Sequence, residues 1–229
     1  MHGTVPFLGL LVVPGIPLLM QPDTDTYLIM VAAAIAMFLT AGGRFRDVIL
    51  MGVSGILLLT ILFFTRDYIK QRIEVFLNPT LDPQGSGYQI KQSLIAVGSG
   101  GVVGRGFGQS IQKFEYLPEP TSDSIFAVYA EEFGFVGSVV LLMLFIGFAL
   151  RGYRIATHAP DLFGMLLVVG IITLIIAQVF LNIAAMVALA PLSGLPLPFI
   201  SHGGTALLVM LGAVGIVLSV SKYQRPNMY

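Results

Sequence analysis

Residues 162–192 read LFGMLLVVGIITLIIAQVFLNIAAMVALAPL, a run without a charged side chain. A helix needs roughly 20 apolar residues to cross a bilayer core of about 30 Å, so this run can span a membrane and is too long for one straight span. Backbone in contact with lipid must satisfy its own hydrogen bonds, which favours a helix. The run therefore predicts a membrane-spanning helix followed by a proline-rich break.

The whole chain is too apolar for most of its surface to face water. Its 229 residues are 56% hydrophobic and 10% charged, with a mean hydropathy of +0.89, whereas a soluble domain carries about 25% charged residues. The 12 basic and 12 acidic residues balance, so no strong field favours nucleic acid as a partner. The absence of cysteine from the sequence excludes disulfides, thiolate metal sites and a cysteine nucleophile.

Six apolar runs are expected to be helical spans, because the period-2 alternation of barrel strands is missing. They cover residues 5–20, 27–41, 48–64, 125–150, 162–192 and 206–220. The predicted fold is all-α, a polytopic membrane helical bundle with about six transmembrane helices in one domain over residues 1–229. A long outer loop is expected at about 65–124, and a re-entrant Pro/Gly-rich segment at 191–205. The first run is short and contains Pro14 and Pro17.

Basic residues in short loops predict the orientation, because cytoplasmic loops carry an excess of Lys and Arg. These residues follow the second, fourth and last runs, which places all of them on one side: Arg44, Arg46, Arg151, Arg154, Lys222 and Arg225. That side is predicted to be the cytoplasm, and the C-terminus lies there too. Segments 66–124 and 191–204 then face outward.

Acidic side chains gather near the start of the fourth run. Glu131 and Glu132 lie about two turns into it, and charges at that depth are costly and usually face a polar cavity or a partner. Asp123 stands beside the first apolar turn, where the simplest structural role is that of a helix N-cap. The glutamate pair therefore predicts a polar cavity or a partner inside the membrane region.

Two segments are rich in residues that interrupt helices. The first, GSGGVVGRGFG at 98–108, suits either a backbone cradle for phosphates or a flexible turn. The second, at 191–205, holds three prolines and three glycines and is expected to be irregular, buried in protein or lining an outer cavity. Within it, His202 is either a titrating group or a satisfied polar residue. Asn182 is expected to bond a neighbouring helix.

Four blocks, in this order, resemble motifs of the SEDS family (FtsW/RodA/SpoVE), the bacterial cell-division, rod-shape and sporulation polymerases. They are QPD at 21–23 (family motif QPDxGT), YQIKQS to GSGG at 88–101 (YQxxQSxxAxGSGG), EYLPE to EEFG at 115–134 (EYLPExxTDFIFAxxxEELG) and LPLPFIS to GG at 195–204 (GLPLPFISYGG). Because family members have about ten spans, the chain resembles their second half and is expected to be a truncated or fragmentary product. The stretch 116–120 favours the division type.

The resemblance implies a peptidoglycan glycosyltransferase that polymerises lipid II on the outer face of the bacterial cytoplasmic (inner) membrane, during division or elongation. The sugar 4-hydroxyl of one unit attacks the anomeric carbon of the growing chain, and undecaprenyl pyrophosphate leaves. Asp123 matches the family's essential aspartate and would be the general base. The implied substrate-binding residues are Lys113, Glu115, Glu119, Arg105 and Ser201.

Cofactors and partners are implied by the same resemblance. The charge of the leaving pyrophosphate would be stabilised by Lys113, by Arg105 or by a divalent cation, Mg²⁺ or Mn²⁺. The expected partners are lipid II, undecaprenyl pyrophosphate, a class B penicillin-binding transpeptidase and membrane proteins of the divisome or elongasome.

Two other functions stay open. A lipid II flippase is the first, since broken helices and buried glutamates also suit transporters. A non-catalytic scaffold that binds a transpeptidase is the second. An assay that scores polymer formation separately from headgroup translocation distinguishes the three.

Overall fold

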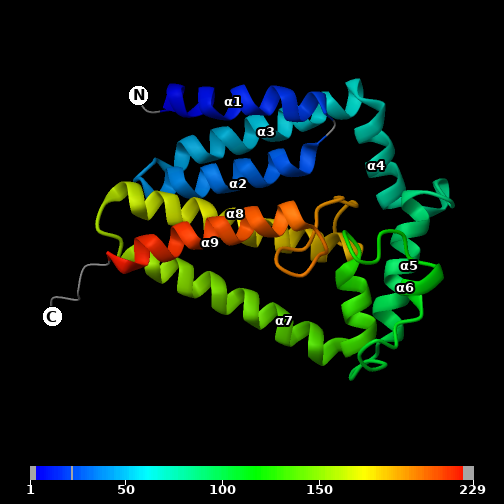
Figure 1. Cartoon of the computed structure of the whole chain (residues 1–229). Helices are drawn as coiled ribbons and strands as arrows, with labels where there is room; N and C mark the ends of the chain where they lie inside the picture. Colours follow the sequence, from blue (N-terminus) through cyan, green and yellow to red (C-terminus); the bar gives the residue numbers. More distant parts are fainter. Residues whose placement is uncertain (1–3, 22, 224–229) are drawn as a thin grey trace. The chain divides into compact units, whose positions relative to one another are not determined.

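The computed structural model describes residues 4–21 and 23–223, apart from the side chains of residues 4–8, 10, 58 and 115. Pro22 and Arg225, used above in the motif and in the orientation, lie outside the described residues. The six predicted spans appear as six helices (Figure 1): α1 Thr4–Met20, α2 Thr24–Thr40, α3 Phe45–Thr65, α7 Ile125–Thr157, α8 Leu162–Met186 and α9 Gly204–Lys222. The predicted all-helical membrane fold is confirmed.

The six helices differ in their capacity to span a bilayer. Within the described ranges, α3, α7, α8 and α9 are long and apolar enough to cross a membrane. The α1 and α2 helices have 17 residues each, about 25 Å at 1.5 Å per residue, which is less than a bilayer core of about 30 Å. These two helices need a locally thinner bilayer or flanking residues to cover the difference.

The chain divides into two compact units, which we describe separately. One unit holds Met1–Arg66, Ala149–Ala177 and Leu211–Tyr229, and the other holds Asp67–Phe148 and Gln178–Met210. In the first unit α1 packs against α2, and α2 contacts α3. An apolar cavity of about 760 Å³ in this unit is lined by α1, α2 and α8, through side chains such as Leu11, Met30 and Leu166.

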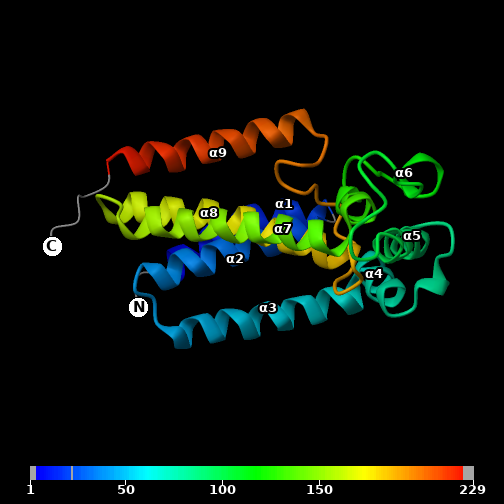
Figure 2. The same cartoon turned by 90° about the horizontal axis from the view of Figure 1, so that it is seen from below.

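The segment predicted as a long outer loop connects α3 to α7 and contains short helices that the sequence did not predict. It contains α4 Asp67–Leu77, a 3-10 turn η1 Pro79–Leu81, α5 Ser86–Ser99 and α6 Gln112–Glu115. α4 lies beside α5 (Figure 2) and also contacts η1. Apolar side chains of these helices are buried, among them Ile69, Val75 and Ile90. Burial of these side chains stabilises the short helices, which would be marginal alone.

The fourth predicted span is not one straight helix. α7 runs on to Thr157 and is interrupted at Gly134, whose backbone has φ 66° and ψ −163°. On one side of the break, the N–H groups of Arg105 and Gly106 donate to the carbonyls of Glu131 (3.0 Å) and Glu132 (2.9 Å). The glycine-rich loop thus supplies the donors that the helix lacks there.

The glycine-rich loop also accepts hydrogen bonds from α7. The N–H groups of Phe135 and Val136 donate to the carbonyls of Gly101 (2.9 Å) and Val102 (3.0 Å). A Cβ on Gly134 would collide with the Gly104 nitrogen and lie 2.7 Å from the Val102 carbonyl oxygen. The glycine-rich loop is therefore a backbone clamp on α7, and its amides at 105 and 106 are not free to cradle phosphate.

The Pro/Gly-rich segment is irregular, as predicted. α8 ends at Met186, and no regular helix or strand forms over 187–203, all of which the structure describes. Ala188 and Phe199 there have φ values of 54° and 67°, which residues other than glycine rarely adopt. The excess length of run 162–192 is thereby explained, because its last six residues leave the helix.

Replacing Gly134 with Ala is expected to destabilise the chain by at least about 1–3 kcal/mol, the cost of forcing a Cβ into such a backbone region. The matched control is Gly147→Ala in the same helix, where an added Cβ meets no atom within 4 Å. That control should be neutral or slightly stabilising. Thermal unfolding of the two variants in detergent measures the difference, and equal midpoints would contradict the clamp.

Candidate functional site

Asp123 lies in the loop just before α7, which begins at Ile125. Its carboxylate Oδ1 accepts a hydrogen bond from the Ser122 hydroxyl at 3.0 Å, and the residue is half-buried. An N-cap at this position would accept from the N–H of Ile125 or Phe126, and neither amide donates to the Asp123 carboxylate in the described structure. The N-cap interpretation of Asp123 is therefore not supported, and its carboxylate faces a neutral hydroxyl.

The main chain around Asp123 is anchored to the irregular segment 187–203. The His202 N–H donates to the carbonyl of Thr121 at 2.8 Å. The Ser201 hydroxyl donates to the carbonyl of Ser122 at 2.6 Å. Three consecutive carbonyls are held in this way, because the Asn182 side chain donates to that of Asp123 at 2.8 Å.

Two side-chain amides on α8 donate hydrogen bonds to carbonyls of the irregular segment. Asn182 also donates to the carbonyl of Leu195 (2.7 Å), and Gln178, one turn earlier, donates to that of Pro196 (2.8 Å). Asn182 was expected to bond a neighbouring helix, and its partners are loop carbonyls. Gln178 was not predicted to take part. Its position four residues before Asn182, in a run without charged residues, could have indicated it.

The irregular segment passes directly beside the Asp123 carboxylate. A Cβ placed on Gly194, which has φ +52°, would lie 3.7 Å from Asp123 Oδ2. Ser201, predicted to bind substrate, uses its hydroxyl in the fold, since it also accepts from the Leu197 N–H at 2.7 Å. The structure thus brings Asp123 and Ser201 together, with Ser201 supporting the loop that carries Asp123.

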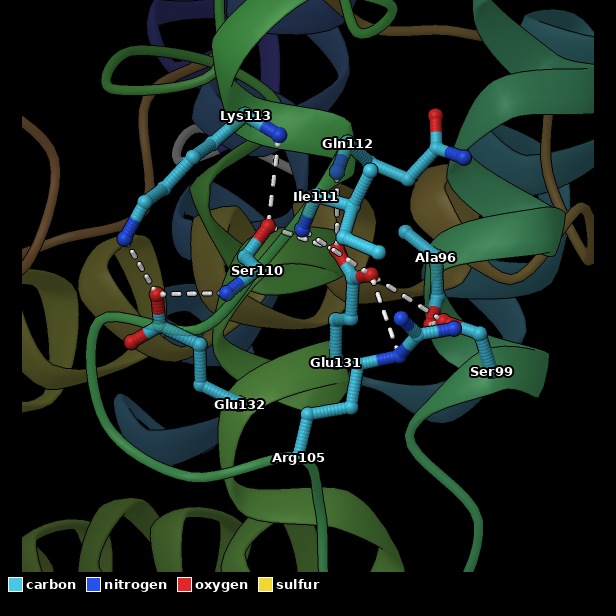
Figure 3. Close-up of polar contacts among 9 residues, drawn as sticks. All are labelled: Ala96, Ser99, Arg105, Ser110, Ile111, Gln112, Lys113, Glu131 and Glu132. Atoms are coloured by element: carbon cyan, nitrogen blue, oxygen red, sulfur yellow. Dashed lines mark hydrogen bonds and ion pairs between the residues drawn. The ribbon is translucent and has the colours of Figure 1, made fainter.

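A second polar cluster surrounds Glu131, which is 1% exposed (Figure 3). Its carboxylate accepts hydrogen bonds from the Ser110 hydroxyl at 2.6 Å and the Ser99 hydroxyl at 3.2 Å. The N–H groups of Ile111 and Gln112 add two bonds of 3.3 Å. The Arg105 Nε lies 3.4 Å from Glu131 Oε1, so this buried charge has both donors and a counter-ion.

Glu132 is also buried and paired. Its carboxylate lies 2.6 Å from Lys113 Nζ and accepts from the Ser110 N–H at 3.4 Å. A buried charge is tolerated when it has a partner and its hydrogen bonds. Of the two predicted surroundings of the glutamate pair, a polar cavity or a partner, the structure shows partners.

The two cations of this cluster were predicted to bind substrate. The Arg105 and Lys113 side chains, 37% and 24% exposed, are held against α7 by their ion pairs with Glu131 and Glu132, about two turns from its start. Their positive charges are balanced by these carboxylates. A direct role of either cation toward pyrophosphate stays a prediction.

The remaining predicted residues are Glu119 and Glu115. Glu119 is exposed, has φ 48°, and its carbonyl accepts from the N–H groups of Ser122 and Ser124. It thus forms the turn that leads to Asp123. The Glu115 side chain lies outside the described residues.

The described residues offer no cluster of ligands for the predicted divalent cation. Within the described part of the chain, no three His, Asp or Glu side chains gather closely enough to hold a metal ion. The carboxylates of Glu131 and Glu132 are committed to Arg105 and Lys113. A cation at this site stays a prediction.

Comparison with known proteins places these features in a family. The model of the cell cycle protein family FtsW/RodA/SpoVE matches residues 1–226. Stage V sporulation protein E of Bacillus subtilis is 47% identical over 224 residues, which are 98% of this chain and 61% of that protein. A probable peptidoglycan glycosyltransferase FtsW of Geobacter sulfurreducens is 44% identical over 96% of this chain and 59% of that protein.

Peptidoglycan glycosyltransferase MrdB of Escherichia coli K12 is 37% identical over 95% of this chain and 60% of that protein. The chain therefore spans about 60% of the length of the curated relatives it matches.

Two solved structures are similar at 26% identity. One is from work on a peptidoglycan synthase complex that coordinates polymerization and crosslinking (TM-score 0.72, covering 92% of this chain and 59% of that chain). The other is Thermus thermophilus rod shape determining protein RodA (TM-score 0.61, covering 98% of this chain and 59% of that chain). The chain belongs to the FtsW/RodA/SpoVE family of cell cycle proteins.

Proposed function

We propose that this chain carries the catalytic aspartate of a peptidoglycan glycosyltransferase that polymerises lipid II. Relatives at 44% and 37% identity are named as peptidoglycan glycosyltransferases. The observation that carries the proposal is the setting of Asp123: a half-buried carboxylate beside an irregular segment, with its main chain held by hydrogen bonds from Asn182 and Ser201. A reacting hydroxyl needs such a fixed and accessible base.

Asp123 suits a general base better than the other acids of the region. Glu131 and Glu132 are buried and already paired with cations, so neither is available to take a proton from a substrate. The Asp123 carboxylate has a neutral partner, the Ser122 hydroxyl.

In the proposed step Asp123 takes the proton of the sugar 4-hydroxyl. The oxygen of that hydroxyl forms a bond to the anomeric carbon of the growing chain. The bond from that carbon to the pyrophosphate oxygen breaks, and undecaprenyl pyrophosphate leaves with the electron pair.

The charge on the leaving pyrophosphate needs compensation. Lys113 and Arg105 are the candidate cations, and both would have to share their charge with Glu132 and Glu131. A divalent cation would supply positive charge at the leaving oxygen. The substrate-binding roles of Glu115, Glu119 and Ser201 belong to this proposal as well.

The proposed setting is the bacterial cytoplasmic membrane, with the C-terminus in the cytoplasm and Asp123 on the outer face. A transpeptidase is the proposed partner, because one structural relative is described in a complex that couples polymerization to crosslinking. Divisome or elongasome membrane proteins are proposed as further partners. A lipid-linked substrate can then reach Asp123 sideways from the bilayer.

Transport of lipid II is the weaker candidate. Its main support was the pair of buried glutamates and the broken helices. The glutamates are neutralised by Arg105 and Lys113, and the break in α7 is closed by the glycine-rich loop. Both features thus have a structural role that does not require movement of a substrate.

Replacing Asp123 with Asn is expected to lower the formation of glycan strands from labelled lipid II by about 10²–10⁴-fold, because an amide cannot accept the hydroxyl proton. The assay uses the 229-residue chain and also its fusion to the part of the Bacillus subtilis relative that it does not cover, since the chain spans 61% of that protein. Headgroup translocation is scored separately in the same liposomes.

The control for this experiment is Asp47→Asn, which removes a carboxylate from the first turn of α3 and should leave strand formation unchanged. Comparable membrane abundance of the two variants excludes a folding defect. Full polymerisation by the Asp123→Asn variant would contradict the assignment of Asp123 as the general base.

The proposed orientation predicts which cysteines an impermeant maleimide reaches. Since the chain lacks cysteine, single substitutions give a clean signal. Gln84→Cys, between η1 and α5, should be labelled in intact spheroplasts, whereas Thr157→Cys, at the end of α7 after Arg151 and Arg154, should be labelled only after permeabilisation. The reverse pattern would show that the basic loops face outward.

A further inference from the structure

The loop that clamps α7 exposes large apolar side chains. Val102, Val103 and Phe107 are 66%, 80% and 82% exposed, and Ile111 and Phe114 follow at 52% and 73%. We call these five side chains the 102–114 loop face. Exposed apolar side chains that form one patch mark an interaction site, and these five lie within thirteen residues of the chain.

The loop face continues an apolar surface of α7. The loop carbonyls of Gly101 and Val102 accept from Phe135 and Val136, and the Phe107 ring centroid lies 6.0 Å from that of Phe133. Phe135 and Val136 are themselves exposed, on a helix long and apolar enough to cross a bilayer. Lipid that covers this part of α7 therefore reaches the loop face as well.

The break in α7 indicates the depth at which the loop face lies. Between Gly134 and Arg151 the helix carries no charged residue, which is about 24 Å of helix at 1.5 Å per residue. A bilayer core is about 30 Å thick, so the two ends of this stretch lie near its two edges. With Arg151 at one edge, Gly134 and the loop bound to it lie near the other.

The charged residues of segment 102–114 are each paired with a glutamate of α7. Arg105 pairs with Glu131, and Lys113 pairs with Glu132. An exposed apolar segment whose charged residues are paired fits the boundary between acyl chains and headgroups, where Phe and Tyr are favoured. Binding to a charged surface of another protein would instead require a net charge of the opposite sign on the loop face.

We propose that the 102–114 loop face is a membrane-interface anchor. It inserts Val102, Val103 and Phe107 into the acyl-chain boundary of one leaflet and holds the break in α7 at headgroup level. The ligand is bilayer lipid, without preference for headgroup charge. This anchor does not depend on the catalytic role proposed for Asp123.

The test uses single cysteines in the 229-residue chain, which contains none, reconstituted in phosphatidylcholine nanodiscs. Phe107→Cys and Val103→Cys report on the loop face. Val140→Cys, on an exposed position of α7, is the lipid control, and Gln84→Cys, at an exposed loop position, is the water control.

Each cysteine carries a fluorophore that is quenched by spin-labelled lipid or by aqueous iodide. The loop positions should be quenched by lipid as strongly as position 140. Their reaction with a water-soluble maleimide should be at least about tenfold slower than at position 84, because apolar surroundings suppress the reactive thiolate. Adding anionic phosphatidylglycerol should leave both readings unchanged.

Three results would overturn the anchor. The first is iodide quenching at positions 103 and 107 equal to that at position 84. The second is protection that appears only when a transpeptidase is reconstituted with the chain, which would assign the face to a protein partner. The third is lipid quenching that rises steeply with anionic lipid, which would mean an electrostatic attachment.

Discussion

A backbone carbonyl that is released from a helix and buried away from water must find another donor, and most of this structure follows from that constraint. Gly134 interrupts α7 and frees the carbonyls of Glu131 and Glu132, which the amides of the glycine-rich loop satisfy. A Cβ added at Gly100 or Gly104 would collide with the carbonyl oxygen of Ala130 or Glu132, so glycine is required at these two points of contact with α7. The same contact carries Arg105 to Glu131, so the ion pair and the clamp form together.

In the irregular segment before α9, two backbone carbonyls accept hydrogen bonds from side chains instead of from other backbone amides. Gln178 and Asn182 donate to the carbonyls of Pro196 and Leu195, and Asn182 uses its second N–H on Asp123. Because each amide has two N–H groups, one side chain can tie two loops together. The position of the Asp123 main chain is therefore a consequence of how the broken backbone is satisfied.

Charge-free runs predicted the six apolar helices, since length and hydropathy largely decide what lies in a bilayer. They did not reveal the break at Gly134, because glycine is common in membrane helices and the partners of the break lie about thirty residues earlier. The helices of the outer segment were missed because their apolar faces are short. Glu131 and Glu132 were recognised as needing partners, but Ser99 and Ser110 carry no pattern that would identify them. Asp123 was selected by family resemblance, and its contacts with 187–203 depend on three-dimensional packing.

The anchoring bonds around Asp123 have an evolutionary consequence. The carbonyls of Thr121, Ser122 and Asp123 are the groups that are held, and every amino acid has a carbonyl. The side chains at positions 121 and 122 can therefore vary among descendants without loss of these three bonds. Natural variation can then change the wall around the carboxylate, and with it the range of sugars or peptides admitted, while the aspartate itself stays in register.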